Sequence, residues 1–199
     1  MSISTYGSEE RRFHAPLARH TGHRGQEAAC GPPKTRWGRV MAPLRFVADC
    51  MLGRLARWLR AFGFDVTYHP FADDDEVAQW ARERDAVLLT RDTRLRAPGT
   101  RMFFVRDDHV EEQLKQVVDE LPLDLSQARP LTRCTVCNQA LAAATRDEVW
   151  DRIPPFVYLT QVHFAVCPGC GRVYWEGTHA PRMRARLREL MGRAAGGPR

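Results

Sequence analysis

Four cysteines in the last third of the chain have the spacing of a metal site. Cys134 and Cys137 form one C-x2-C pair, and Cys167 and Cys170 form a second pair after a stretch running from residue 138 to residue 166. Each pair places two thiolates on one tight turn, and two pairs complete the tetrahedral sulfur shell that zinc favours. We therefore expect one structural zinc ion, which contributes directly to folding.

A second group with chemical potential consists of aspartates that follow short apolar segments. Asp49 follows LRFVA, Asp92 comes two residues after AVLLT, and Asp107 and Asp108 follow RMFFVR. Carboxylates that meet at one place repel each other unless a divalent cation neutralises them. A Mg²⁺ or Mn²⁺ ion held there can activate a water molecule and stabilise charge that develops on a phosphate. Asp49 and Asp92 are the first candidates, with Asp107 as a fourth acid.

The third acid of this group is expected from the run of three aspartates at residues 73–75. The same run opens an amphipathic segment, where acids cap backbone N–H groups and suit the helix dipole, so capping is the alternative role. Asp108 has the same alternative, because it stands three residues before Glu111, the spacing of a capping box.

The elements that would position these acids alternate between strand and helix. Such alternation implies a parallel sheet with right-handed crossovers. In these sheets the ligand site lies beyond the carboxyl ends of the strands, which is where the acids stand. We expect strands over 44–48, 65–68, 86–90 and 101–106, and helices over 51–64, 73–85 and 108–121.

Composition divides the 199-residue chain into four segments. Residues 1–42 have no helical or strand periodicity and are rich in Gly, Pro, Arg and His, so we expect them to be disordered. Met41 stands just before the first strand and is an alternative start. The other segments are an α/β domain over 44–127, a zinc ribbon over 128–181 with a helix (RDEVWDRI) and a strand (FVYLT) between its cysteine pairs, and a basic helix and tail over 182–199.

The chain is basic, with 30 Lys and Arg residues against 24 Asp and Glu and a net charge of +6. Arginine pairs with phosphate groups through its planar fork. Arg54 and Arg57 share a face of the first helix that Arg60 continues, Arg91 precedes an acid, and residues 182–188 carry an arginine stripe. We expect these side chains to hold a nucleic-acid backbone; the alternative is a solvated helix face.

No apolar run approaches the roughly 18 residues of a membrane-spanning helix, and no signal-peptide pattern follows the first Met. In such a chain two C-x2-C pairs indicate metal binding in a reducing compartment, so we expect a cytoplasmic protein without a membrane partner. Tyr174 and Trp175, beside the second pair, are expected either to stack a base or to pack in the ribbon core.

Five segments together resemble the PIN-like ribonuclease domain named for the carboxy-terminal part of the Mut-seven exonuclease. They are FVADCMLGRLARWLRAFGFDV, DDDEVAQWARERDAVLLTRDTRL, VRDDHVEEQL, CTVCNQAL and CPGCGRVYWEGTHAPRM, in the family's order over about residues 44 to 190. The resemblance implies an α/β protein, a PIN-like parallel-sheet sandwich with a C-terminal four-cysteine zinc ribbon. It also implies a Mg²⁺- or Mn²⁺-dependent ribonuclease.

The resemblance also implies which aspartates form the catalytic metal site. The family's first acid falls on Asp49, its strand-end acid on Asp92, and its middle acid on Asp74, with Asp75 as the second choice. These acids would hold the catalytic Mg²⁺ or Mn²⁺ ion. Further candidates are Asp107 and Asp108, and the residues expected to bind the RNA backbone are Arg54, Arg57 and Arg91.

Two other functions fit the same pattern. One is a non-catalytic RNA-binding or interaction module whose acidic pocket no longer cleaves. The other is a toxin-type ribonuclease controlled by an antitoxin, with association to the ribosome or tRNA as a further partner hypothesis.

Overall fold

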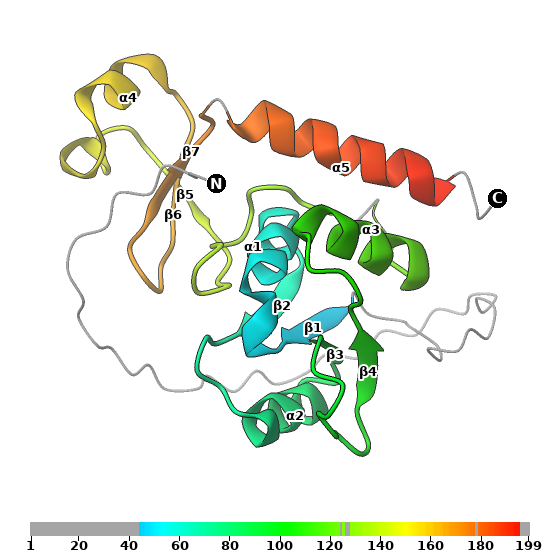
Figure 1. Cartoon of the computed structure of the whole chain (residues 1–199). Helices are drawn as coiled ribbons and strands as arrows, with labels where there is room; N and C mark the ends of the chain where they lie inside the picture. The colour runs from blue at the N-terminus through cyan, green and yellow to red at the C-terminus, as the bar shows by residue number, and fades with distance from the viewer. Residues whose placement is uncertain (1–43, 124, 126–127, 178, 196–199) are drawn as a thin grey trace, which may run out of the picture.

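The computed structural model of the chain describes residues 44–123, 125, 128–177 and 179–195 (Figure 1). The predictions of a disordered segment over 1–42 and of an alternative start at Met41 lie outside these residues. Figure 1 shows an α/β body, a small antiparallel ribbon beside it, and a long C-terminal helix lying across the body.

Four parallel strands form the central sheet. They are β1 (Arg45–Ala48), β2 (Asp65–Tyr68), β3 (Val87–Thr90) and β4 (Arg101–Phe104), in the order β2-β1-β3-β4. The predicted strands are confirmed. Because the chain places β2 on one side of β1 and β3 on the other, the order reverses at β1. A crevice opens beyond the carboxyl ends of the strands at such a reversal, and ligands bind there.

The alternation of side chains along β1 separates two apolar layers. Phe46 and Ala48 pack on one face of the sheet, and Val47 packs on the other. Helices α1 (Gly53–Ala61) and α3 (Val110–Glu120) cover the first face, and α2 (Asp74–Glu83) covers the second. The three predicted helices of this region are therefore confirmed, and they enclose the sheet in three layers.

The C-terminal helix α5 (His179–Ala195) belongs to the same apolar core as β1, α1 and α3. Met183, Leu187 and Leu190 recur every three or four residues and are buried in that core. Burial of one such side chain stabilises the fold by about 1.5–3 kcal/mol. Among the described residues, no helix is both long and apolar enough to cross a membrane.

The ribbon consists of three short antiparallel strands, β5 (Ala142–Ala144), β6 (Phe164–Val166) and β7 (Val173–Trp175), in that order. The predicted helix between the cysteine pairs shortens to a 3-10 turn at Trp150–Arg152. The predicted strand at FVYLT is wrong, because this segment forms helix α4 (Pro155–Thr160). Pro155 suits the first position of a helix. The side chains of Phe156 and Leu159 are exposed, so the segment has no buried apolar face of the kind that a strand would need.

Candidate active site and metal centre

The four cysteines of the two C-x2-C pairs lie together as the spacing predicts. Their sulfur atoms are all within 4.8 Å of one another, with 3.6 Å between Cys134 and Cys170 and 3.3 Å between Cys137 and Cys167. All four are free thiols. A zinc ion at about 2.3 Å from each sulfur requires sulfur atoms about 3.8 Å apart. The cluster therefore fits a zinc ion held by four thiolates.

The two cysteine turns are built alike although their sequences differ. Asn138 follows the first pair with φ of 69°, and Gly171 follows the second with φ of 71°. Asparagine and glycine adopt this left-handed conformation most readily. The backbone N–H of Asn138 donates to the carbonyl of Cys134 at 3.0 Å, and that of Gly171 donates to Cys167 at 2.9 Å.

Tyr174 supports the first cysteine turn from β7. Its hydroxyl lies 3.1 Å from the sulfur of Cys134 and accepts from the backbone N–H of Thr135 at 3.3 Å. The side chain of Tyr174 is buried, so the structure shows it packed in the ribbon core and not free to stack a base. Burial opposes ionisation of Cys134, but hydrogen bonds from the Cys137 N–H and the Tyr174 hydroxyl outweigh it and lower the pKa of that thiol to about 7. Burial instead raises the pKa of Cys170 to about 11.

Arg60 joins the first cysteine turn to helix α1. The side chain is 2% exposed. Its Nε donates to the Val66 carbonyl at 2.9 Å, and its Nη1 donates to the carbonyls of Thr135 at 3.2 Å and Val136 at 2.7 Å. Burial lowers the pKa of Arg60, and negative charge on the nearby cysteine thiols opposes that change. The prediction that Arg60 continues the exposed face is therefore wrong, because its guanidinium turns away from solvent to carbonyls of β2 and of the first cysteine turn.

Asn138 makes the second connection between ribbon and sheet. Its Oδ1 accepts from the backbone N–H of Val66 at 3.1 Å, and its Nδ2 donates to the carboxylate of Asp65 at 2.6 Å. Arg133 adds a hydrogen bond to the Gly63 carbonyl at 3.2 Å. The ribbon is thus fixed to β2 and to the end of α1 by hydrogen bonds from several side chains.

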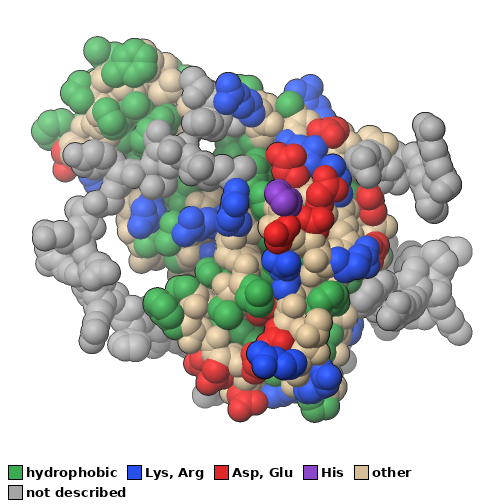
Figure 2. Space-filling model, viewed as in Figure 1, with side chains coloured by type: hydrophobic (Ala, Val, Ile, Leu, Met, Phe, Trp, Pro, Cys, Tyr) green, Lys and Arg blue, Asp and Glu red, His purple; other side chains and the backbone are tan. Residues whose placement is uncertain are grey.

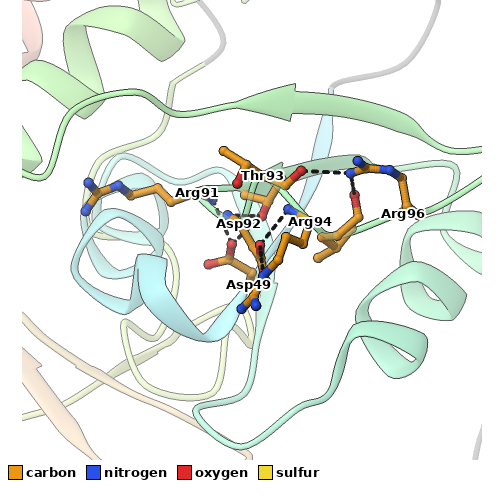
Figure 3. Close-up of polar contacts among 8 residues, drawn as sticks. Asp49, Arg91, Asp92, Thr93, Arg94 and Arg96 are labelled. Carbon is orange, nitrogen blue, oxygen red and sulfur yellow. Dashed lines mark hydrogen bonds and ion pairs between the residues drawn. The ribbon is translucent and has the colours of Figure 1, made fainter.

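At the carboxyl end of β1, Asp49 is 4% exposed and both of its carboxylate oxygens accept hydrogen bonds (Figure 3). One oxygen accepts from the backbone N–H of Met51 at 2.9 Å, which caps the 3-10 turn η1 (Cys50–Leu52). The other accepts from the Thr90 hydroxyl at 2.5 Å and the Arg91 N–H at 2.8 Å. Three donors fix the position of this buried carboxylate.

Thr90, at the end of β3, links Asp49 to Asp92. Its hydroxyl donates to the Asp49 carboxylate and accepts from the backbone N–H of Asp92 at 2.9 Å. The Asp92 carboxylate accepts from the Arg94 N–H at 2.7 Å (Figure 3). Through Thr90, the two acids are thus joined at the carboxyl ends of β1 and β3, where the strand order reverses. Sequence reasoning missed Thr90, although a hydroxyl that ends an otherwise apolar strand was a visible signal.

The three aspartates at residues 73–75 differ in what their side chains do. Asp73 is the N-cap of α2 and forms a capping box with Glu76, with hydrogen bonds of 2.8 and 3.0 Å. Asp74 and Asp75 lie exposed in the first turn of α2. In the part of the chain that the structure describes, the carboxylates of Asp49, Asp74 and Asp92 do not form a cluster within 4.8 Å.

A second group of potential ligands within 4.8 Å of one another consists of Asp107, Asp108 and His109. Asp107 accepts from the His109 backbone N–H at 2.7 Å, and this hydrogen bond is the main cause that lowers the pKa of Asp107. The N-cap of α3 is His109, so the predicted capping box between Asp108 and Glu111 is wrong. Figure 2 shows a histidine surrounded by acidic side chains over the start of α3. Sequence reasoning did not single out His109.

The arginines divide into exposed and paired side chains. Arg54 and Arg57 are exposed on α1, and Arg91 is half-buried next to Asp49. In the C-terminal stripe, Arg184 pairs with Glu176, and Arg186 is also in an ion pair. Exposed positive charge therefore lies on α1, close to the segment that Asp49 caps, and also on α5, where Arg182 and Arg188 are exposed.

Comparison with known protein families gives a match that spans the sheet, the ribbon and part of α5. The family described as the Mut7-C RNAse domain matches residues 44–187 of the chain. No curated protein and no solved structure gives a match to the chain. The matched range begins just before β1, includes Asp49, Asp92 and all four ribbon cysteines, and ends within α5. The chain therefore belongs to the Mut7-C RNAse domain family.

Proposed function

We propose that the protein is a Mg²⁺- or Mn²⁺-dependent ribonuclease that hydrolyses RNA phosphodiester bonds at the carboxyl edge of its sheet, in a PIN-like sandwich. One observation carries the proposal. The Thr90 hydroxyl joins the Asp49 carboxylate to the backbone of Asp92 at the reversal of the strand order. A parallel sheet uses this place for ligands, and the chain belongs to a ribonuclease domain family.

The residues at this edge fit a magnesium-type ion. Mg²⁺ in phosphate-processing sites is commonly held by one or two carboxylates, and it keeps several waters and substrate oxygens. Asp49 and Asp92 would supply those carboxylates, with Asp74 or Asp75 approaching from α2 and Asp107 or Asp108 from the end of β4. The bound ion would supply Lewis acidity at the phosphate and lower the pKa of a water molecule.

The side chains of this chain would bind and orient the RNA. Arg54 and Arg57 are exposed and face solvent, where they can pair with backbone phosphates. The Arg91 side chain would do the same from the end of β3. Three hydrogen bonds hold Asp49 before substrate arrives, so little freedom is lost when the reacting groups meet. The zinc ribbon would support α1 through the hydrogen bonds of Arg60. We also propose that the protein acts in the cytoplasm.

The test is cleavage of a labelled RNA with added Mn²⁺ or Mg²⁺, comparing the unchanged protein with Asp92→Asn. We expect the variant to lose several kcal/mol of transition-state stabilisation, about 100-fold or more in rate. Asp151→Asn, the same chemical change at an exposed position on the ribbon, should cleave normally. If the unchanged protein binds RNA without cutting it at any metal concentration, a non-catalytic RNA-binding module is the correct function.

A further inference from the structure

Two large apolar side chains stand in solvent beside the acidic edge. Phe71 is 87% exposed in the loop between β2 and α2, and Met51 is 59% exposed on the turn that follows Asp49. These segments continue from β2 and β1, which are neighbours in the sheet. Both side chains are therefore carried by segments that leave the carboxyl ends of β2 and β1, the sheet edge at which Asp49 stands.

Contacts between the two segments keep them together. The last residues of the strands, Ala48 and Tyr68, are register partners, and the Tyr68 hydroxyl donates to the Cys50 carbonyl at 3.3 Å. The backbone N–H of Met51 is bound to the Asp49 carboxylate. The position of Met51 is thus fixed by the candidate catalytic acid itself.

The loop that carries Phe71 is anchored in the core on its α2 side, and Phe71 contacts another ring within the loop. Ala72 is buried in the core below α2, and the Phe71 N–H donates to the His69 ring at 3.4 Å. The rings of His69 and Phe71 meet edge to face with centroids 6.0 Å apart. Burying a phenylalanine side chain stabilises a fold, and this loop forgoes that gain at Phe71.

Positive charge lies next to these apolar side chains. Arg54 is exposed three residues after Met51, and Arg57 is exposed one turn further along α1. In Figure 2, blue side chains lie above a group of green ones on the left of the α/β body. A ligand that suits this surface has flat apolar groups joined by negative charges. Single-stranded nucleic acid has that chemistry, because each base offers a stacking face and each linkage offers a phosphate.

We propose that Phe71 and Met51 form a subsite on which an unpaired RNA base stacks, with Arg54 on the adjoining phosphate. The proposal rests on the proposed function and deepens it by naming single-stranded RNA as the substrate class. The bases of a duplex already stack on one another, so they offer no free face to Phe71. The subsite therefore favours unpaired segments.

The test is equilibrium binding of a fluorescein-labelled single-stranded RNA to the full chain, followed by anisotropy without added Mg²⁺ or Mn²⁺. Phe71→Ala should weaken binding about 5- to 150-fold, the range of one lost stacking contact, and Phe71→Trp should restore it. Phe156→Ala is the matched control, since Phe156 is 73% exposed on α4, away from this edge. An oligomer of the same length without bases should bind the unchanged protein and Phe71→Ala equally.

The result that overturns the subsite is equal weakening by Phe71→Ala and Phe156→Ala, or equal binding of single-stranded RNA by Phe71→Ala and the unchanged protein. Because the assay measures binding, its failure is distinguishable from failure of the proposed function. A protein that cleaves RNA normally after Phe71→Ala lacks the subsite but keeps the activity. A protein that binds bases through Phe71 and never cleaves keeps the subsite and lacks the activity.

Discussion

The guanidinium of Arg60 donates a 2.7 Å hydrogen bond to the carbonyl oxygen of Val136, which lies between the two cysteines of the first pair. Arg60 is in the last turn of α1, and the segment leading into α1 is capped by Asp49. One helix therefore has the zinc-ribbon contact near its end and the candidate catalytic acid just before its start.

Arg60→Met should destabilise the protein strongly. The substitution keeps a long side chain but leaves the carbonyls of Val66, Thr135 and Val136 without their donor, and the first two of these residues are buried. Each unsatisfied buried group costs about 1–3 kcal/mol, so we expect the free energy of unfolding in urea to fall by about 2 kcal/mol or more. Arg57→Met, on the exposed face of the same helix, should change it by less than about 0.5 kcal/mol. Equal effects of the two substitutions would contradict the role assigned to Arg60.

Thr90→Val should impair the acidic edge while preserving the shape of the strand. Valine lacks the hydroxyl, so the Asp49 carboxylate loses one of its three donors and the Asp92 N–H loses its acceptor. We expect RNA cleavage to fall about 10- to 100-fold, as for other partners that orient metal-binding side chains. Initial rates across a Mn²⁺ titration measure this effect. Thr90→Ser keeps the hydroxyl and should retain most activity; a serine variant as impaired as the valine one would show that the hydroxyl is not the cause.

Zinc should copurify with the protein at one ion per chain, measured by elemental analysis. Removing it with a strong chelator should lower the temperature of unfolding, because the bound metal supplies folding energy, and added zinc should restore that temperature. Zinc must be held by thiolates, so acidification should release it. Cys134→Ser should lose zinc, whereas Cys50→Ser, at an exposed free cysteine outside the cluster, should keep it. A full zinc content in Cys134→Ser would contradict the four-thiolate site.

Leu190→Ala should lower the free energy of unfolding by about 2–5 kcal/mol, the range for a buried leucine replaced by alanine. Leu190 is fully buried in the core that α5 shares with α1 and α3. Leu159→Ala on α4 removes the same atoms from a side chain that is 74% exposed, so it should have little effect. Chemical denaturation of both variants gives the comparison. A small effect at position 190 would mean that α5 is dispensable for the core.

The sequence predicts the sheet, and the place of Asp49 and Asp92 at its edge, because both depend on local patterns. Apolar runs of four or five residues form β1 and β3, and the acids that follow them, Asp49 and Asp92, reach one edge by the geometry of parallel strands. The two cysteines of each pair are also close in sequence, so their spacing predicts each cysteine turn. Spacing alone therefore predicts the cysteine cluster and the positions of Asp49 and Asp92 at the edge of the sheet.

The remaining features depend on partners distant in sequence. The helical spacing of Arg54, Arg57 and Arg60 suggests one shared face, but carbonyls some 75 residues further along the chain draw Arg60 inward. The apolar and aromatic residues of FVYLT favour a strand, yet no strand pairs with them in the described residues and Pro155 starts a helix instead. The cap at His109 likewise depends on how Asp107 turns the backbone, which composition does not reveal.

The place of α5 in the core has a consequence for how the protein is made. Phe46 in β1 and Leu190 in α5 belong to one apolar cluster, so parts of that cluster are synthesised far apart in time. Translation adds about 5–20 residues per second from the N-terminus. Until α5 leaves the ribosome, the faces of α1 and α3 that it covers stay open to water and to chaperones. A chain that stops before α5 would therefore retain Asp49, Asp92 and the four clustered cysteines but would expose the apolar faces of α1 and α3 to water.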